Sequence, residues 1–390
     1  MGGLKRRTLP PWCINLGLFL ASVILALGLA EGGCRIYAAL VPPTPTTHYQ
    51  FRLSRPLPYR NADYFSRGFI QESFAQPGGW KTDRSFGWMP NDFHGQYFNV
   101  SGGKRKTTDG PGPSETQGRI LIFGGSTVHC SEVPDSLTLS SCLQRVLNGK
   151  GHGQIKAENL GATTVTIKQQ LARLKMEPIA PGDVVVFYDG VNDVIQSIFY
   201  NNPEGTIIDE SRKQLEGLSR FNRFLFKVHR RLAPYSAFVA VLLNPVKPSG
   251  QGREIDPATV GVAARQYQQS IVQAAEHCRS KGAKFVHFLQ PCLLATPAKS
   301  DYEKRLLENG WLTAPGLARA FEVGYAAFRR ACSETAEAGV PHFDLSGCLD
   351  SRTEEVYLDY AHVNHVANEM IARAIHSHLA GLLMPPAVRK

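Results

Sequence analysis

The sequence predicts an α/β protein built on a parallel β-sheet and preceded by one membrane-spanning helix. From residue 119 onward, short β-branched runs alternate with longer amphipathic stretches, which is the pattern of βαβ units. Near the N-terminus lies a charge-free apolar run that is long enough to enter a bilayer. With 390 residues, of which 43% are hydrophobic and 19% charged, the chain can bury one substantial core.

The apolar run covers residues 14–30 and follows three basic residues at positions 5–7. This arrangement is typical of a signal-anchor or a signal peptide. A cleaved signal peptide is disfavoured, because no clear small-x-small cleavage site directly follows the apolar core. We therefore expect a cytoplasmic tail over residues 1–12 and a transmembrane signal-anchor over residues 13–41.

Charge near this segment indicates its orientation in the membrane. The basic residues of the short tail favour a cytoplasmic N-terminus, which would place the rest of the chain on the periplasmic or extracellular side of the plasma membrane. The asymmetry is modest, because Arg35, Arg52, Arg55 and Arg60 lie close behind the apolar run.

The overall charge is basic, with a formal value of +10 and a pI near 9.2. Lys and Arg are nevertheless scattered, and no basic run is longer than the one at positions 5–7. Because affinity for phosphate backbones requires clustered positive charge, we expect no binding to nucleic acid.

Eight cysteines are present, and six of them lie beyond the apolar segment. They show no CxxC pair and no metal-ligand spacing. Disulfides are permitted in an exported domain of this kind, but buried free thiols are equally compatible with the sequence.

The segment before the alternating pattern, residues 42–118, is rich in Pro, Gly, aromatic residues and Arg and lacks sustained periodicity, which predicts a stalk and a leading lobe. The main domain is expected over residues 119–384, with an insertion beside the sheet at about 194–256. Its five strands are expected at residues 119–123, 155–160, 183–188, 284–289 and 341–345. Its helices are expected near residues 138–149, 165–177, 257–281, 315–338 and 364–380.

Ligands of an open parallel sheet bind beyond the carboxyl ends of its strands. The first three expected strands are followed by Gly124-Gly125-Ser126-Thr127, by Asn159-Leu160-Gly161 and by Gly190-Val191-Asn192-Asp193. Taken singly, these residues have ordinary structural uses, since glycines permit turns and Ser, Asn or Asp cap helices. Together they bring a hydroxyl, a glycine amide and a side-chain amide to one crevice.

Asp359 and His362 lie directly before the last expected helix, and their spacing of three brings the two side chains together on a turn. A serine hydroxyl needs a neighbouring base, and that base works best when a third group orients it. We therefore expect a catalytic triad of Ser126, His362 and Asp359. The donors available for a developing oxyanion are the Ser126 and Gly161 amides and the Asn192 side chain.

Three further residues near these motifs are weaker candidates for a functional role. His129 and His365 could line a pocket, but we expect solvated loop histidines. Asp193 is expected to cap the helix that follows the third strand.

The four segments ending in Ser126-Thr127, Gly161, Asn192-Asp193 and Asp359-x-x-His362 resemble, in order, the four blocks of the SGNH/GDSL hydrolase family. The resemblance covers roughly residues 119–383. Gly125 stands where the family often has Asp, and the Gly-Gly-Ser-Thr turn looks like the variant found in membrane-anchored bacterial members. The resemblance implies a flavodoxin-like three-layer α/β/α sandwich with a five-stranded parallel sheet. It also implies the family's catalytic and oxyanion roles for the matching residues.

These features predict a serine esterase that hydrolyses an acetyl or acyl ester on a cell-envelope glycan or lipid. A polysaccharide O-acyltransferase would use the same residues and pass the acyl group to a sugar hydroxyl. A membrane-tethered scaffold that binds glycan without turnover is the alternative from another class. No cofactor or metal is expected, because the sequence has no phosphate loop, dinucleotide fingerprint or metal-ligand cluster.

Overall fold

A computed structural model of the chain describes residues 10–40, 57–75, 80–83, 86–203, 224, 254–296, 300–308, 310–337 and 339–383. The chain divides into two compact units. The N-terminal helix belongs to one unit and the α/β domain to the other, and each is described by itself.

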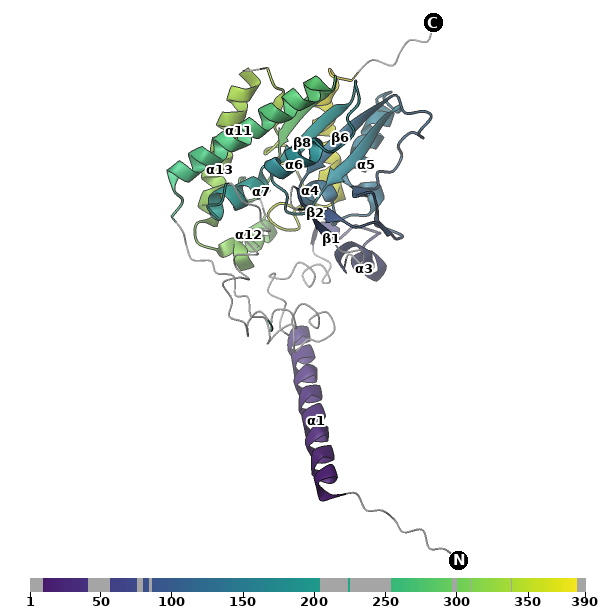
Figure 1. The fold of residues 1–390 in the computed structure, drawn as a ribbon, viewed down its shortest axis with the longest axis vertical. Coiled ribbons are helices and arrows are strands. Elements are labelled where there is room, and N and C mark those ends of the chain that lie inside the picture. The colour runs from purple at the N-terminus through teal and green to yellow at the C-terminus, as the bar shows by residue number, and fades with distance from the viewer. Residues whose placement is uncertain are drawn as a thin grey trace, which may run out of the picture. The chain divides into compact units, whose positions relative to one another are not determined.

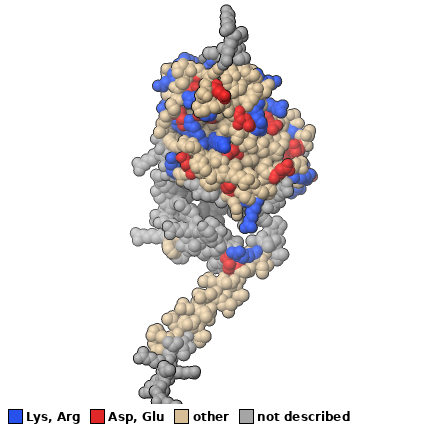
Figure 2. Space-filling view, turned by 90° about the vertical axis from the view of Figure 1, so that its right-hand side faces the viewer, with Lys and Arg blue, Asp and Glu red and all other residues tan. Residues whose placement is uncertain are grey.

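The N-terminal helix α1 spans Pro11–Leu40. Its section Asn15–Ile36 has a mean hydropathy of 1.9 and is 0% buried, so by length and composition it can cross a membrane, although a signal sequence passes the same test. Most of its surface is uncharged, as Figure 2 shows in tan. Glu31 and Arg35 pair at 2.8 Å across one helical turn, which partly neutralises the two charges near the end of the helix.

The five expected strands of the α/β domain are all present, and they form parallel pairs in the order β10-β9-β8-β6-β7. The first of them along the chain, β6, therefore lies between the second and the third. This is the point at which the strand order reverses and where such folds bind ligands. The strands are β6 (Gly118–Gly124), β7 (Ile155–Gly161), β8 (Val184–Asp189), β9 (Lys284–Leu289) and β10 (His342–Asp344).

The sheet is larger than predicted, because three short antiparallel strands continue it beyond β7 and make eight strands in all. The expectation of a purely parallel, five-stranded sheet is thus corrected to a mixed sheet. The added strands have two or three residues each, too few for a periodic pattern, and they cover part of the outer edge of β7. They are β3 (Phe93–His94), β4 (Asn99–Ser101) and β5 (Lys104–Arg105), all within the segment expected as a leading lobe.

Helices cover both faces of the sheet, which confirms the three-layer architecture. Alternate side chains of β6 enter two different cores: Leu121 and Phe123 face one, and Ile120 and Ile122 face the other. The first core is covered by α6 (Ile167–Leu174), α11 (Pro257–Ser280) and α13 (Leu317–Glu337), and α11 and α13 lie side by side in Figure 1. The second is covered by α5 (Leu139–Gly149), α12 (Asp301–Leu307) and α14 (His365–Leu379).

Shorter elements connect this framework. The segment expected as an insertion, 194–256, begins with the π-helix η3 (Val194–Phe199), whose side chains enter the first core. Residues 204–223 and 225–253 of that segment lie outside the described residues. All eight cysteines are free thiols. The remaining elements are η1 (Leu57–Tyr59), α3 (Arg67–Ala75), β1 (Trp80–Asp83), β2 (Gly87–Pro90), α4 (Ser126–His129), η2 (Asp135–Leu137), α7 (Val191–Asp193) and η4 (Gly310–Thr313).

Candidate active site

Ser126 is the first residue of the short helix α4, directly after the central strand β6. The residue before it, Gly125, is where the chain turns from strand to helix. A Cβ atom at Gly125 would lie 2.5 Å from Asn192 Nδ2, so only glycine allows the Asn192 side chain to approach this turn. The sequence Gly125-Ser126 thus brings the hydroxyl and the amide side chain close to each other.

The side chains of Ser126, His362 and Asp359 form one hydrogen-bonded chain. His362 Nε2 lies 2.7 Å from Ser126 Oγ, and His362 Nδ1 lies 2.7 Å from Asp359 Oδ2. A carboxylate can only accept, so Nδ1–H donates to Asp359 and Nε2 is left to accept the Ser126 proton. The His362 and Asp359 side chains are 11% and 13% exposed, which shelters the pair from bulk water.

The turn that carries Asp359 and His362 is held by its own backbone. Asp359 Oδ1 accepts the N–H groups of Ala361 at 2.9 Å and of His362 at 2.7 Å. The His362 carbonyl accepts Leu358 N–H at 2.8 Å, and the Tyr360 carbonyl accepts Leu293 N–H at 2.7 Å. The last bond ties the turn to the segment that follows β9, so the base is positioned by the sheet as well as by helix α14.

Asn192 lies in α7, which follows strand β8. Its Nδ2 donates to the Val165 carbonyl at 2.9 Å. A side-chain amide has two N–H groups, so this bond orients Asn192 and leaves one donor for another acceptor. Within the described part of the chain, the Ser126 amide donates to no protein acceptor, and it stands beside the reacting hydroxyl.

Gly161 is arranged differently from the expected oxyanion donor. Its N–H donates to Asn159 Oδ1 at 3.0 Å. A Cβ atom at this position would lie 2.2 Å from the His129 backbone nitrogen, so the glycine is needed for β7 to pack against α4. The position therefore has a clear packing role, and its amide hydrogen already has an acceptor.

Thr164, three residues further on, was not singled out by the sequence. Its φ is 60°, a left-handed conformation that is unfavourable for a β-branched residue. Among the described residues its amide has no protein acceptor, and the next residue, Val165, accepts the bond from Asn192. This role could not be predicted from the sequence. Every residue except proline has a backbone N–H, and threonine is not a residue type that indicates a positive φ.

Comparisons with known proteins find solved structures of similar fold, but no relative by sequence. No protein-family model and no curated protein matches the chain. A lipase/acylhydrolase from Enterococcus faecalis matches with 16% identity and a TM-score of 0.38, covering 69% of this chain and 99% of its own. A carbohydrate acetylesterase from Sinorhizobium meliloti matches with 13% identity and a TM-score of 0.38, covering 68% and 100%. A catalytic mutant of an acetylxylan esterase from Geobacillus stearothermophilus matches with 11% identity and a TM-score of 0.39, covering 68% and 94%.

The chain's own geometry, and not these low TM-scores, identifies the fold. Three motifs in the family's order stand at the ends of β6, β7 and β8 in a sheet with the order 2-1-3-4-5, and the fourth, on the turn before α14, contacts the first. The fold is that of an SGNH/GDSL hydrolase. Three antiparallel edge strands are added to this SGNH/GDSL core on the side of β7.

Three polar residues near the SGNH/GDSL motifs are placed differently from expectation. His129 is fully buried against the Phe98 ring, and burial, followed by the charge of Arg105, lowers its pKa to about 3. His365 is half-buried, with Nδ1 3.2 Å from the Tyr64 hydroxyl. Asp193 accepts backbone N–H groups of Gly190 and, at 2.9 Å, of Ile167, so it holds the turn after β8 and also caps α6, the helix after the second parallel strand.

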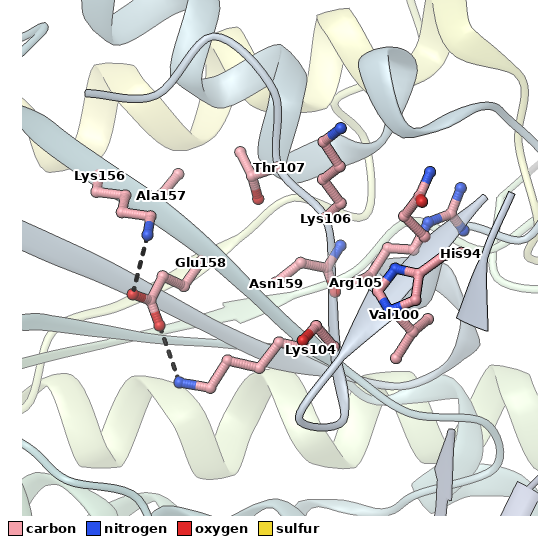
Figure 3. A pocket seen from close by; sticks show the side chains of 12 residues that line it. His94, Val100, Lys104, Arg105, Lys106, Thr107, Lys156, Ala157, Glu158 and Asn159 are labelled. Carbon is pink, nitrogen blue, oxygen red and sulfur yellow. Dashed lines mark hydrogen bonds and ion pairs between the residues drawn. The ribbon is translucent and has the colours of Figure 1, made fainter. Parts of the chain in front are cut away.

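A pocket of about 440 Å³ lies where the added strand β5 meets β7, and none of the triad residues lines it. Figure 3 shows Lys104 and Lys156 reaching the Glu158 carboxylate from two sides, at 2.9 and 3.9 Å. Lys104 also lies 3.1 Å from Glu177. Lys104 and Lys156 are therefore paired with acidic side chains at this pocket.

Proposed function

We propose that this chain is a serine esterase that hydrolyses an acetyl or acyl ester through a covalent acyl-enzyme on Ser126. The observation that carries the proposal is the chain of two 2.7 Å contacts from Asp359 through His362 to Ser126. A serine in such a chain is an activated nucleophile, whereas a serine that only caps a helix needs no base.

The reaction proceeds in two halves that use the same residues. Ser126 Oγ attacks the ester carbonyl carbon while its proton passes to His362 Nε2, and Asp359 stabilises the imidazolium. His362 then gives this proton to the departing alcohol, which leaves the acyl group on Ser126. In the second half a water gives a proton to His362 Nε2 and attacks the acyl carbonyl. His362 then returns this proton to Ser126 Oγ as the bond between the acyl carbon and Oγ breaks, which releases the acid and restores the serine.

The negative charge on the attacked carbonyl oxygen needs donors that are already oriented. We assign this role to the Ser126 amide, the Asn192 side chain and, in place of Gly161, the Thr164 amide. The left-handed backbone at Thr164 supports the assignment, because strained conformations are retained where they orient a functional group.

The apolar helix α1 supports a location at a membrane, and the basic residues before it favour a single-pass plasma-membrane protein with its catalytic domain on the periplasmic or extracellular side. An enzyme held there meets cell-envelope material. We therefore propose an acylated envelope glycan or lipid as the substrate.

The full chain, purified in detergent, tests this function with p-nitrophenyl acetate and with an acetylated glycan, each with and without an acceptor sugar. We expect hydrolysis without acceptor and its loss in Ser126→Ala, with Ser377→Ala as the matched control, since Ser377 bonds only within the exposed face of α14. A fluorophosphonate should label the wild type and Ser377→Ala but not Ser126→Ala. Turnover that requires the acceptor would indicate an acyltransferase, and equal rates in wild type and Ser126→Ala would leave only a binding role.

A further inference from the structure

A second group of reactive side chains lies in the core beneath α11 and α13 and shares no residue with the triad. It consists of His287 on β9, His342 on β10 and Cys332 on α13, and we call it the histidine–cysteine cluster. One ligand atom from each residue lies within 4.8 Å of the others. His287 and Cys332 are fully buried, and His342 is partly exposed at the edge strand.

The two histidines are placed by the register of the sheet. His342 is the partner of His287 in the parallel pair β10 and β9, so their side chains leave the sheet on the same face. The rings stack with centroids 5.0 Å apart, and the two Nδ1 atoms lie 2.7 Å from each other. At that distance one nitrogen donates and the other accepts.

The orientation of His287 indicates which nitrogen has the free lone pair. On its far side, Nε2 lies 3.1 Å from Asp189 Oδ1 and 2.9 Å from the Tyr267 hydroxyl. Tyr267 also hydrogen-bonds Asp189 Oδ1. The carboxylate can only accept, so it favours a proton on His287 Nε2 and turns the unprotonated Nδ1 toward His342 and Cys332. A carboxylate behind a histidine in this way is the usual outer support of a metal ligand.

We propose that the histidine–cysteine cluster binds a divalent transition-metal ion of the zinc type, through His287 Nδ1, His342 Nδ1 and Cys332 Sγ. Imidazole and thiolate together select such ions, and Asp189 supplies the outer hydrogen bond. Three protein ligands leave a fourth position, on the partly exposed side of His342, for a water molecule.

Binding requires small movements and one proton release. With metal–nitrogen distances of about 2.0–2.1 Å in a tetrahedral site, the two Nδ1 atoms would stand about 3.3 Å apart, so they separate by about 0.6 Å as the metal replaces their hydrogen bond. The proton between them moves to His342 Nε2. Cys332 loses its thiol proton to solvent as the metal–sulfur bond forms, so affinity should rise with pH.

The cluster explains why polar groups occur in an otherwise apolar region. Phe285, Phe328 and Leu289 belong to the same core, where a buried polar group needs a partner, and the metal would replace the His287–His342 hydrogen bond as that partner. A bound metal would join β9, β10 and α13, and so would hold the edge strand β10 to the helix that covers it. Sequence spacing does not reveal the site, because its ligands come from three separate elements.

The test uses full-length protein in detergent, stripped with a chelator and titrated with Co²⁺ as a spectroscopic probe. We expect about one Co²⁺ per chain, with a thiolate-to-cobalt charge-transfer band and the visible bands of a tetrahedral ion, and displacement of both by Zn²⁺. Cys332→Ser should abolish the charge-transfer band. Cys278→Ser is the matched control, because Cys278 is another fully buried thiol of the same core on α11, and it should leave the band unchanged.

His342→Gln, at the partly exposed edge of the sheet, provides a second variant should Cys332→Ser fold poorly, and it should weaken Co²⁺ binding at least tenfold. Fluorophosphonate labelling of Ser126 and the circular dichroism spectrum report whether each variant is folded. Absence of stoichiometric Co²⁺ and Zn²⁺ binding by the folded wild type would overturn the proposal, as would a charge-transfer band that survives in folded Cys332→Ser.

Discussion

His362 Nε2 and Ser126 Oγ are 2.7 Å apart, although 236 positions separate the two residues in the chain. The contact joins the end of the central strand β6 to the turn before the last helix. It therefore requires the end of β6 and the turn before α14 to be in their folded positions, so activity should report the integrity of this part of the α/β domain.

Replacing Asp359 by Asn is expected to lower kcat by about 10⁴-fold while the fold is kept. The asparagine oxygen can still accept the Ala361 and His362 amides. Its NH₂ group would face His362 Nδ1 and favour the tautomer with the proton on Nε2, which cannot accept the Ser126 proton. Initial rates with p-nitrophenyl acetate measure the effect, and a loss below tenfold at unchanged melting temperature would show that His362 needs no such partner.

Asn192→Ala should lower kcat by about 10²–10³-fold and leave KM nearly unchanged, because an oxyanion donor acts mainly on the transition state. Asn148→Ala is a suitable control, since Asn148 bonds the Asp109 carbonyl at the exposed end of α5. Steady-state kinetics on both variants separates the two parameters. A raised KM with unchanged kcat would instead indicate that Asn192 binds the ground state.

Thr164→Gly should raise the free energy of unfolding by about 0.5–1 kcal/mol, because glycine adopts the φ of 60° without the steric cost paid by threonine. The backbone N–H remains, so kcat should stay within about twofold of the wild type. Thr163→Gly should instead be destabilising, since Thr163 has no positive φ to relieve. Urea denaturation and ester hydrolysis test the two effects, and a large loss of kcat in Thr164→Gly would implicate its side chain.

Arg105→Met is expected to destabilise the protein by about 3–5 kcal/mol, because it leaves the Asp135 carboxylate buried without its partner. The Arg105 and Asp135 side chains are 0% and 8% exposed and lie 2.6 Å apart. Arg319→Met removes a pair of similar length, 2.7 Å, whose side chains are 61% and 68% exposed, and should cost less than about 0.5 kcal/mol. Equal losses in urea denaturation would contradict this difference.

His129 should make stability fall in acid. Burial, and then Arg105, lowers its pKa to about 3 from an unfolded value near 6.5, so the folded state favours the neutral ring. The contribution of neutral His129 to the free energy of unfolding is complete above about pH 6.5 and is lost as the pH falls toward 3. The stability difference between wild type and His129→Gln should therefore shrink over that range, by at most about 1.4 kcal/mol per pH unit. Parallel stability curves for the two proteins would rule out this titration.

The elements of the α/β domain could be predicted because each has a local signature. The runs of β6 and β8 are rich in apolar and β-branched residues and are followed by turn residues, and the amphipathic stretches between the strands are long enough to be helices. The strands β3, β4 and β5 escaped prediction, because two or three residues carry no periodicity. They were expected as part of a leading lobe. Pairing of β5 with β7, of β4 with β5 and of β3 with β4 makes them part of the sheet.

The sequence by itself determined which strands and helices form and which side chains follow each strand, since these depend on local composition and spacing. Only the tertiary structure decided which backbone amides lack a protein acceptor and can donate to an oxyanion, and which polar groups meet in the core. Gly161 donates to Asn159 while Thr164 has the strained backbone, and His287, Cys332 and His342 converge from three elements. The orientation of backbone amides and the contacts between distant side chains depend on how the layers pack. That packing cannot be predicted from the residue types of a local stretch of sequence.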